Sequence, residues 1–347
     1  MPTPRTMRRG VAAATAALFL ATSLAACGSG SGDSADGAST TKIKIGKAVD
    51  TIGYSAIDVA IDQGYFKDAG IDVDVVTLNG STVANGALES GDIQFAGYSS
   101  LPLLQAREKG ADILSVASFD YGVPLQIVVA GSYADKIDAS APLTDRIKAL
   151  DGAKIGFVSS TDGGYIDLLV KQAGLAADAI KKVQFNSAQA ALTAAESGEV
   201  DGAIGSPPST IEAVKTGKVT TAASLREVPE YAQTTYDLLN TTTDYAKSHP
   251  DTVKAVATAI AEADNYINDP ANKQALIKLE SSHFSGFSSD ALGSSLGLAT
   301  YSKNGLQTQE QWDNAVKTYT EGGLIKGDPA TEGTTWTNKY IALDQLK

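Results

Sequence analysis

The sequence KIKIGKAVDTIGYSAIDVAIDQGYFKDAGIDVDVV, residues 42–76, decides the fold class. Isoleucine and lysine alternate at its start, which predicts a half-buried strand from residue 43 to about residue 49. Apolar residues then recur at helical spacing from Tyr54 to Tyr65, and a period of two returns from Ile71 to Val75. A strand, a helix and a strand joined by short glycine-containing turns form a βαβ unit, whose two strands are parallel.

The same alternation of strand and helix patterns continues along the chain. The C-terminal third differs, because Pro250 starts a helix and Thr308 opens another, in which Trp312 and Tyr319 lie at helical spacing as expected core contacts. The pattern predicts an α/β protein with C-terminal helices packed on its first lobe. The further strands are predicted at residues 93–97, 113–117, 126–130, 154–158, 183–185 and 203–205.

An internal repeat indicates that the α/β region is made of two related lobes. Residues 79–110 align with residues 186–217 without a gap, and the block Glu89-Ser90-Gly91-Asp92-Ile93 then matches Glu196-Ser197-Gly198-Glu199-Val200. Alanine and glycine are common in this chain and produce some chance matches, but an ungapped five-residue block is harder to obtain from composition alone. The predicted boundaries are 42–122 plus 232–347 for lobe 1 and 123–231 for lobe 2.

The N-terminal residues have the layout of an export signal. Three arginines precede an apolar stretch at residues 11–24, which ends in Leu24-Ala25-Ala26-Cys27. This ending resembles the lipobox of bacterial lipoproteins, in which the cysteine is acylated and becomes the new N-terminus; alternatively, Cys27 is incidental and cleavage occurs nearby. We expect a signal peptide at 1–26 and a lipidated Cys27 followed by a flexible tether to residue 41, because residues 28–41 hold no large apolar side chain.

Composition restricts the partners of the mature chain. Without residues 1–26 the sequence holds 25 Lys and Arg against 40 Asp and Glu, a balance that disfavours nucleic acid and anionic lipid surfaces. The single cysteine rules out an intrachain disulfide, and no later segment approaches the ~20 apolar residues that span a bilayer. We expect a monomer on the outer face of the cell membrane, held by lipid. The richness in Ala, Thr, Gly and Asp resembles that of high-GC Gram-positive bacteria.

The predicted site lies where the strands end. In open α/β sheets, ligands bind beyond the carboxyl ends of the strands, and two facing lobes would place both sets of loops across one cleft. These loops contain no Lys, Arg, His or Cys, which argues against a bidentately held, multiply charged anion, a His or Cys metal site and a serine nucleophile with a histidine base. We therefore expect binding without catalysis and no cofactor or metal. The loops are 49–54, 79–82, 97–100, 118–121, 159–165, 186–187 and 205–208.

Two features of these loops favour ligand binding. The run Ser159-Ser160-Thr161-Asp162 precedes a helix, where hydroxyl and backbone N–H groups can hold an anion, although Asp162 could equally cap the helix and repel an anion. Five aromatic residues lie at loop positions, and although each could be a packing residue, the set favours at least two that face a ligand. They are Tyr54, Tyr98, Phe119, Tyr121 and Tyr165.

Four short runs resemble one known family, the nitrate-, taurine- and alkanesulfonate-binding proteins of ABC importers. They are AIDQGYFKDAGI at 60–71, NGALESGDI at 85–93, AGL at 173–175 and YAKSHP at 245–250, within a similarity that spans residues 42–327. The resemblance implies a two-lobed periplasmic-binding-protein fold of type II, with two crossover strands, that closes on a small molecule and delivers it to the transmembrane subunits of a permease. Thiamine-pyrimidine-binding proteins are related, but their Trp- and Asn-rich first loop is replaced here by Asp50-Thr51-Ile52-Gly53-Tyr54.

The resemblance also implies which residues contact the solute. The turn at Ser160-Thr161 would give hydroxyl and amide donors to an anionic group, and the loops at 79–81 and 98–100 would contribute contacts from lobe 1. The turn continues with Asp162-Gly163-Gly164, which departs from the small-hydroxyl pattern of the family and argues against a simple sulfonate or nitrate. The predicted ligand-binding residues are Asp50, Thr51, Tyr54, Asn79, Gly80, Ser81, Tyr98, Ser99, Ser100, Asp120, Tyr121, Ser160, Thr161, Asp162 and Ser206.

Together these observations predict a solute receptor of an ABC importer. We expect an amino-sulfonate zwitterion or a nitrogenous heteroaromatic such as a thiamine-precursor pyrimidine, with Asp120 as the partner of a cationic or N–H group. The alternatives are an enzyme on the same fold, which export and lipidation disfavour, and a sensor that reports solute to a membrane kinase.

Overall fold

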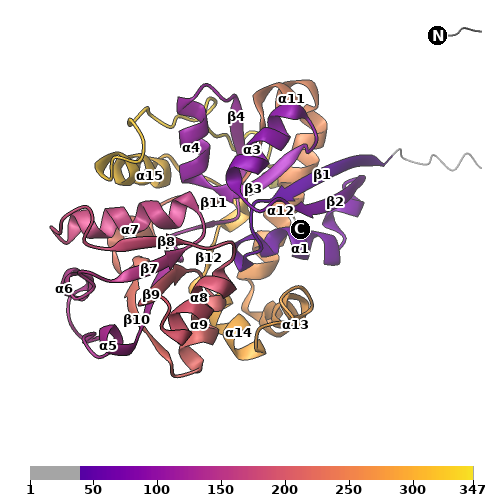
Figure 1. Ribbon diagram of the computed structural model, residues 1–347. Helices are drawn as coiled ribbons and strands as arrows, with labels where there is room; N and C mark the ends of the chain where they lie inside the picture. The colour runs from indigo at the N-terminus through magenta and orange to yellow at the C-terminus, as the bar shows by residue number, and fades with distance from the viewer. Residues whose placement is uncertain (1–39, 347) are drawn as a thin grey trace, which may run out of the picture. The chain divides into compact units, whose positions relative to one another are not determined.

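The computed structural model describes residues 40–346 and contains two five-stranded sheets (Figure 1). The first sheet has the order β2-β1-β3-β11-β4, in which β1 pairs in parallel with β2 and β3, and β11 pairs antiparallel with β3 and β4. The opening βαβ prediction is therefore confirmed. The strands are β1 (Thr41–Lys47), β2 (Ile71–Thr77), β3 (Phe95–Ser99), β4 (Ile113–Ser118) and β11 (Asp237–Thr242).

The second sheet repeats the arrangement of the first. Its order is β10-β6-β9-β7-β8, with β7 parallel to β8 and β9, and β6 antiparallel to β9 and β10. We read the first sheet from β2 and the second from β8. In both, three parallel strands are followed by one antiparallel strand, β11 or β6, which follows a connection between the sheets, and then by a fifth strand that pairs antiparallel with it. The strands are β6 (Gln126–Ala130), β7 (Lys154–Phe157), β8 (Lys181–Gln184), β9 (Gly202–Gly205) and β10 (Val219–Ser224).

The sequence repeat corresponds to a structural repeat. Helix α3 (Ser81–Ser90) leads into β3 as α8 (Ala188–Ser197) leads into β9. Both helices end at a glycine in the left-handed conformation with φ of 80°, Gly91 and Gly198, where a side chain would be strained. The two matched blocks therefore encode the same helix end and the same turn into a strand.

The helices cover the sheets, and the C-terminal ones have the predicted starts. Pro250 occupies the first turn of α12 (Pro250–Asn268), and Thr308 forms a capping box with Gln311 at the start of α15 (Gln309–Glu321). Trp312 and Tyr319 are fully buried, so the prediction that they are core contacts is confirmed. The remaining α-helices are α1 (Ser55–Asp62), α2 (Tyr65–Asp68), α4 (Ser100–Glu108), α5 (Gly131–Ala134), α6 (Leu143–Lys148), α7 (Ser160–Gln172), α9 (Ser209–Lys215), α10 (Pro229–Ala232), α11 (Thr243–Ser248), α13 (Lys273–His283) and α14 (Ser289–Leu298).

Short elements complete the described chain. Two-residue strands β5 and β12 pair antiparallel with each other, and single 3₁₀ turns join several helices. Within residues 40–346, no helix combines the length and the apolar content that crossing a membrane requires. The short elements are η1 (Ile52–Tyr54), β5 (Asp120–Tyr121), η2 (Leu225–Glu227), η3 (Pro270–Asn272), β12 (Thr300–Tyr301), η4 (Lys303–Gly305) and η5 (Leu343–Gln345).

Strands β10 and β11 escaped prediction because their sequences, VTTAAS and DLLNTT, lack an apolar alternation. Strand β11 lies between two neighbours and is buried along most of its length, so its polar residues need partners inside the sheet. Asn240 shows how this is met, because its side-chain amide donates to the carbonyls of Ala96, Tyr98 and Leu238 at 3.1–3.3 Å.

Two C-terminal helices, α14 and α15, contact helices of the second sheet at two separate places (Figure 1). On one side the hydroxyls of Tyr165 in α7 and Tyr319 in α15 lie 3.1 Å apart, both fully buried. On the other side Lys215 in α9 forms an exposed ion pair with Asp290 in α14 at 3.1 Å. The contact between α7 and α15 is therefore buried, and the contact between α9 and α14 is exposed to solvent.

Strand β9 supplies a test of how closely the second sheet is packed. A Cβ added to Gly202 would lie 2.4 Å from the carbonyl oxygen of Val128 in the neighbouring strand, a distance that only a backbone shift can relieve. We expect Gly202→Ala to lower the free energy of unfolding by about 1–3 kcal/mol, measured by urea denaturation, because overpacking forces such shifts. Gly205→Ala in the same strand is the matched control, since its nearest atom would be at an ordinary 3.6 Å. Equal costs for the two variants would contradict this account.

Candidate functional site

The two connections between the sheets pair with each other. The first runs from β5 to β6 and the second from β10 to β11. Gly122 N–H donates to the Thr234 carbonyl at 2.8 Å, and Val123 N–H donates to the Tyr231 carbonyl at 3.0 Å. The two crossovers are thus held side by side by backbone bonds, and residues at their ends are brought together from distant parts of the chain.

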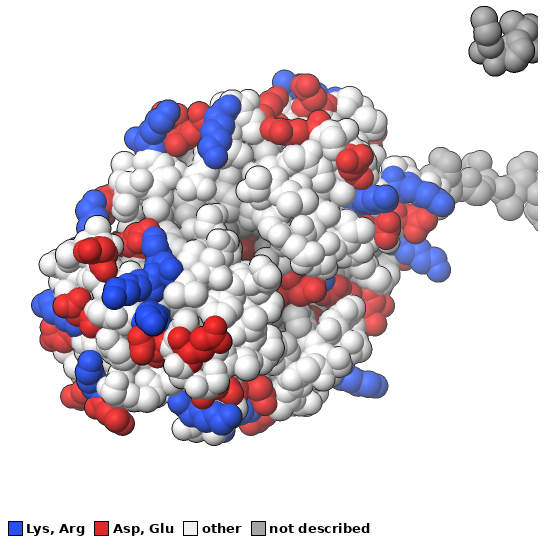
Figure 2. Space-filling view, viewed as in Figure 1, with Lys and Arg blue, Asp and Glu red and all other residues white. Residues whose placement is uncertain are grey.

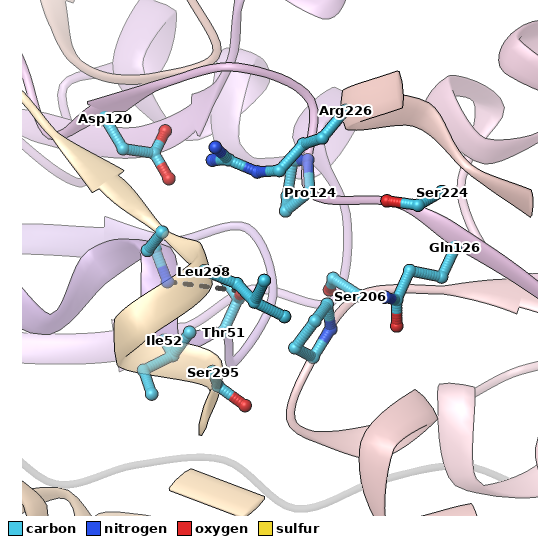
Figure 3. A pocket seen from close by; sticks show the side chains of 13 residues that line it. Thr51, Ile52, Asp120, Pro124, Gln126, Ser206, Ser224, Arg226, Ser295 and Leu298 are labelled. Atoms are coloured by element: carbon cyan, nitrogen blue, oxygen red, sulfur yellow. Dashed lines mark hydrogen bonds between the residues drawn. The ribbon is translucent and has the colours of Figure 1, made fainter. Parts of the chain in front are cut away.

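A narrow pocket, here called the crossover pocket, lies beside these connections (Figure 3). It is bounded by the turn after β1, by the crossovers, by the loop after β9 and by the end of α14. In the space-filling view, charged side chains gather toward the rim of the molecule, and the surface around the central hollow is mostly uncharged (Figure 2). The pocket is lined by Thr51, Ile52, Gly53, Asp120, Pro124, Gln126, Ser206, Pro207, Ser224, Arg226, Ser295, Leu298 and Ala299.

Two buried carboxyls meet behind this pocket. Asp120 is 1% exposed and Asp237 is 4% exposed, and Asp120 Oδ1 accepts a hydrogen bond from the Asp237 N–H at 3.0 Å. The Tyr54 hydroxyl hydrogen-bonds the Asp237 carboxyl. Gly53 makes room for the pair, because a Cβ there would lie 2.2 Å from Asp237 Oδ2 and 3.4 Å from Asp120 Oδ2.

Burial and mutual repulsion set the protonation of these carboxyls. Burial raises the pKa of Asp120 well above its ordinary value, and the charge of Asp237 raises it further, while the Asp237 N–H and Arg226 oppose both effects. Burial also raises the pKa of Asp237 to about 7, against the hydrogen bond from Tyr54. Two carboxyls this close do not readily carry two charges, so the pair retains a proton near neutral pH.

Arg226 faces Asp120 from the second crossover (Figure 3). Its Nη1 donates to Thr300 Oγ1 at 2.7 Å, and its Nη2 donates to the carbonyls of Tyr121 and Gly122 at 3.3 Å. Its Nε is buried and has no hydrogen-bond partner. Among residues 40–346 no ion pair of 4.0 Å or less joins Arg226 to Asp120, although the guanidinium and the carboxyl point toward each other.

The expectation that the cleft holds no cation is therefore wrong. That expectation considered only the loops after the predicted strands, and Arg226 follows β10, which was not predicted. Asp237 was missed for the same reason, because it begins β11. The family resemblance implied a second crossover strand, and this could have pointed to both residues. Such a strand requires a connection back to the first sheet, which has to lie between the repeat and the C-terminal helices.

Of the predicted ligand-binding residues, Thr51, Asp120 and Ser206 line the crossover pocket. Thr51 Oγ1 accepts a hydrogen bond from Gly53 N–H at 3.4 Å and caps the turn at η1 (Figure 3). Tyr121 belongs to β5 beside the pocket and is half-buried. Asp120 thus lies where a cationic or N–H group would need it, and its proposed contact stays a prediction.

A second group of predicted residues meets at the junction between the two sheets. Ser99 and Thr161 are almost buried and their hydroxyls lie 3.5 Å apart across the junction. The Ser100 hydroxyl donates to the Thr235 carbonyl at 2.7 Å and lies 2.9 Å from the Tyr319 hydroxyl. Here the facing loops contact each other directly.

Asp162 caps its helix. It forms a capping box with Ser159, whose N–H donates to Asp162 Oδ2 at 2.8 Å while Ser159 Oγ accepts from the Asp162 N–H. Burial raises the pKa of Asp162, and the bonds from Ser159 and Val158 oppose that rise. The capping interpretation is confirmed, and a ligand contact by Asp162 stays a prediction.

The other predicted residues lie outside the crossover pocket. Asp50 accepts from the Thr77 hydroxyl at 3.1 Å at the surface, Ser160 is exposed, and Asn79, Gly80 and Ser81 form the turn into α3. Four of the five loop aromatics are fully or nearly fully buried and do not line the pocket, because they pack in the hydrophobic core. They are Tyr54, Tyr98, Phe119 and Tyr165.

The described residues offer no obvious metal site. Within residues 40–346, no group of three or more His, Cys, Asp and Glu side chains is arranged to hold a metal ion. His249 is exposed and stacks on Tyr245 with ring centroids 4.4 Å apart, and His283 is exposed at the end of α13. The chemistry of the pocket is therefore that of carboxyl, guanidinium, hydroxyl and amide groups.

The carboxyl pair predicts an unusual dependence of stability on pH. The pKa of Asp237 rises from 3.8 in the unfolded chain to about 7 in the folded chain, so the folded chain binds this proton more tightly. Its contribution to the free energy of unfolding therefore falls as pH rises between these values and is constant above them. We expect Asp237→Asn to gain stability relative to the wild type between about pH 4 and about pH 8, measured by urea denaturation. The exposed Asp244→Asn is the control, and a difference that does not vary with pH would contradict the prediction.

Comparison with known proteins places the chain in a family. The family described as NMT1/THI5 like matches residues 53–273, more than half of the chain. The taurine-binding periplasmic protein of Escherichia coli (strain K12) is 26% identical over 230 residues, which cover 63% of this chain and 67% of that protein.

Solved structures share the fold. The alkanesulfonate-binding protein SsuA from Xanthomonas axonopodis pv. citri is 18% identical with a TM-score of 0.66, covering 82% of this chain and 94% of that one. The nitrate-binding protein NrtA from Synechocystis PCC 6803 is 16% identical with a TM-score of 0.67, covering 87% of each chain. The matching residues include the first crossover, the whole second sheet and β11, and the chain belongs to the NMT1/THI5-like family, with the periplasmic-binding-protein fold.

Proposed function

We propose that this protein is the extracytoplasmic solute-binding component of an ABC importer. It captures a small solute, either an organic molecule of the sulfonate or taurine type or an inorganic anion of the nitrate type, between two lobes and delivers it to the permease without chemical change. The observation that carries the proposal is the crossover pocket, where polar and charged side chains from both sheets and both crossovers converge. The relatives named as taurine-, alkanesulfonate- and nitrate-binding proteins support this class of solute.

The two lobes comprise residues 42–122 with 232–347, and residues 123–231. In support, the strands of the second sheet all lie between residues 126 and 224, and those of the first lie on both sides of that segment. The paired crossovers are then the only peptide connections between the lobes, and a rotation about them would open and close the pocket. The direct contact of Ser99 with Thr161 is consistent with a closed arrangement.

A lipid anchor would hold this receptor beside its permease. Cys27, the signal peptide at 1–26 and most of the tether lie outside the described residues, so this part of the proposal rests on the sequence. The Leu-Ala-Ala-Cys run after a basic and apolar leader supports the anchor, and the relative named as a periplasmic protein supports a location outside the cytoplasm. We also propose a monomer from a Gram-positive bacterium.

One observation favours a second class of solute, a nitrogenous heteroaromatic such as a thiamine-precursor pyrimidine. The carboxyls of Asp120 and Asp237 are acceptors for the N–H groups that such a ring presents. The buried tyrosines would have to move for the ring to stack on them, since Tyr54 and Tyr98 are packed in the core. Solute screening separates the two classes.

A thermal-shift screen tests the receptor function. The full chain in mild detergent would be melted with sulfonates, amino-sulfonates, nitrate, amines, amino acids and aminopyrimidines. A true solute at about one hundred times its Kd stabilises the folded state by about 2.7 kcal/mol and so raises the Tm. Sodium chloride at equal ionic strength is the control. If no solute of the panel raises the Tm, the receptor proposal is wrong.

Replacement of the only cysteine tests the anchor. In cells fed a labelled fatty acid, the wild type should carry label and fractionate with membranes, whereas Cys27→Ser should lose the label. The double variant Cys27→Ser with Ser29→Cys is the matched control, because it keeps one thiol but moves it two residues from the lipobox position. Label that persists in Cys27→Ser would rule out acylation at this residue.

A further inference from the structure

We infer that the crossover pocket selects a zwitterionic solute, whose cationic nitrogen lies beside Asp120 and Asp237 and whose oxoanionic group lies beside Arg226. The inference rests on the proposed solute-binding function and adds the position and polarity of the solute within the site. It separates amino-sulfonates and amino acids from simple anions such as nitrate and from simple amines.

The first observation is a guanidinium and a carboxyl that face each other without forming an ion pair. Asp120 and Arg226 line the same pocket and point toward one another in Figure 3, yet no ion pair joins them within 4.0 Å. Charges that leave water are stable only when they are paired or hydrogen-bonded. The arrangement leaves the carboxyl and the guanidinium free to bind a solute that carries both a positive and a negative group.

The acidic end of the pocket has spare acceptor capacity. Asp120 Oδ1 is occupied by the Asp237 N–H, and the carboxyl is presented to the pocket beside Gly53. An ammonium group here would favour ionisation of the carboxyl pair, because a nearby positive charge offsets the repulsion between the two negative charges. A bare anion at the same place would instead be repelled.

The basic end has spare donors. Arg226 Nε is buried without a partner, while its two terminal nitrogens are held by Thr300, Tyr121 and Gly122. Those bonds orient the guanidinium and leave Nε–H and the second N–H of Nη1 as its unused donors. Ser206 and Gln126 line the same pocket, and the Gln126 carbonyl oxygen accepts a hydrogen bond from the Thr210 hydroxyl at 2.5 Å, so its amide N–H₂ is the end left to donate. A guanidinium in a pocket that also holds hydroxyl and amide donors is suited to a sulfonate or carboxylate.

The position of Arg226 also connects solute binding to the crossovers. It belongs to the second crossover and donates to carbonyls of the first, so a solute anion beside it contacts a residue that both connections share. Asp120 begins the first crossover and Asp237 ends the second. The two ends of the zwitterion would thus be held by residues that belong to both connections.

The test compares matched probes on the full chain by calorimetry and thermal shift. The probes are 2-aminoethanesulfonate, ethanesulfonate, ethylammonium, β-alanine and nitrate, which differ in whether they carry one charge or two. We expect at least one of the two zwitterions to bind about tenfold or more tightly than every singly charged probe, as loss of one charge-assisted hydrogen bond predicts. Similar affinities of zwitterions and singly charged probes would overturn the inference.

Variants assign the two ends. Asp120→Asn should weaken the zwitterion about tenfold and leave ethanesulfonate unchanged or tighter, whereas Arg226→Gln should weaken zwitterion and ethanesulfonate alike. Arg226→Lys keeps the charge but loses Nε–H and should be intermediate. The exposed Glu230→Gln, close to the second crossover in sequence, is the matched control and should bind as the wild type does. Circular dichroism melting confirms folding, and Asp237→Asn replaces Asp120→Asn if that variant does not fold.

The possible failures are distinguishable. If the broad screen finds only singly charged or uncharged solutes, or if both Asp120→Asn and Arg226→Gln bind the zwitterion as the wild type does, the inference is wrong and the receptor function stands. If no solute of the broad screen binds at all, both the inference and the receptor function are wrong. If zwitterions bind more tightly than singly charged probes, and if Asp120→Asn and Arg226→Gln both weaken zwitterion binding, the result supports the inference and the receptor function.

Discussion

The pairing of the two crossovers is the constraint on which the rest of the structure depends. Backbone bonds from Gly122 to Thr234 and from Val123 to Tyr231 hold together segments more than one hundred residues apart in sequence. Because each crossover delivers one antiparallel strand to a sheet, β6 to the second and β11 to the first, the pairing determines which strands neighbour each other. The side chains at the crossover ends then have little freedom in where they lie.

The charges of the candidate site follow from that constraint. Asp120 and Asp237 are adjacent because β5 and β11 begin and end the crossovers, and Gly53 has no side chain to separate them. Their repulsion and burial cost stability, and the cost is offset by packing and hydrogen bonds in the surrounding core. Raised carboxyl pKa values in a pocket are typical of sites that bind or react, although structural pairs raise them as well.

The sequence predicted the local elements well and the long-range ones incompletely. The βαβ start, the repeated helix ends at Gly91 and Gly198, and the capped helices at Pro250 and Thr308 follow from spacing and capping residues that act over a few positions. Strand β11 could not be found in this way, because its polar residues are satisfied by partners such as the Ala96 carbonyl, which lies 144 residues away in the chain.

The same distinction applies to the site. Thr51, Asp120 and Ser206 were found because they follow strands with a clear apolar pattern, whereas Arg226 and Asp237 flank strands without one. At least two of the five loop aromatics were expected to face a ligand, but burial is decided by how the two halves of the molecule pack. Tyr165 is covered by Tyr231 and Tyr319, which come from the second crossover and from α15.

The insertion of β11 between β3 and β4 also has a consequence for how the chain acquires its structure. The second sheet is contiguous in sequence, from residue 126 to residue 224, so all its strands are available before β11 leaves the ribosome. The first sheet begins earlier in the chain but lacks a central strand until residue 242 has emerged, which leaves facing edges of β3 and β4 unpaired in the meantime. The half that is synthesised first is therefore completed last, since its sheet needs a strand that follows the whole second sheet in sequence.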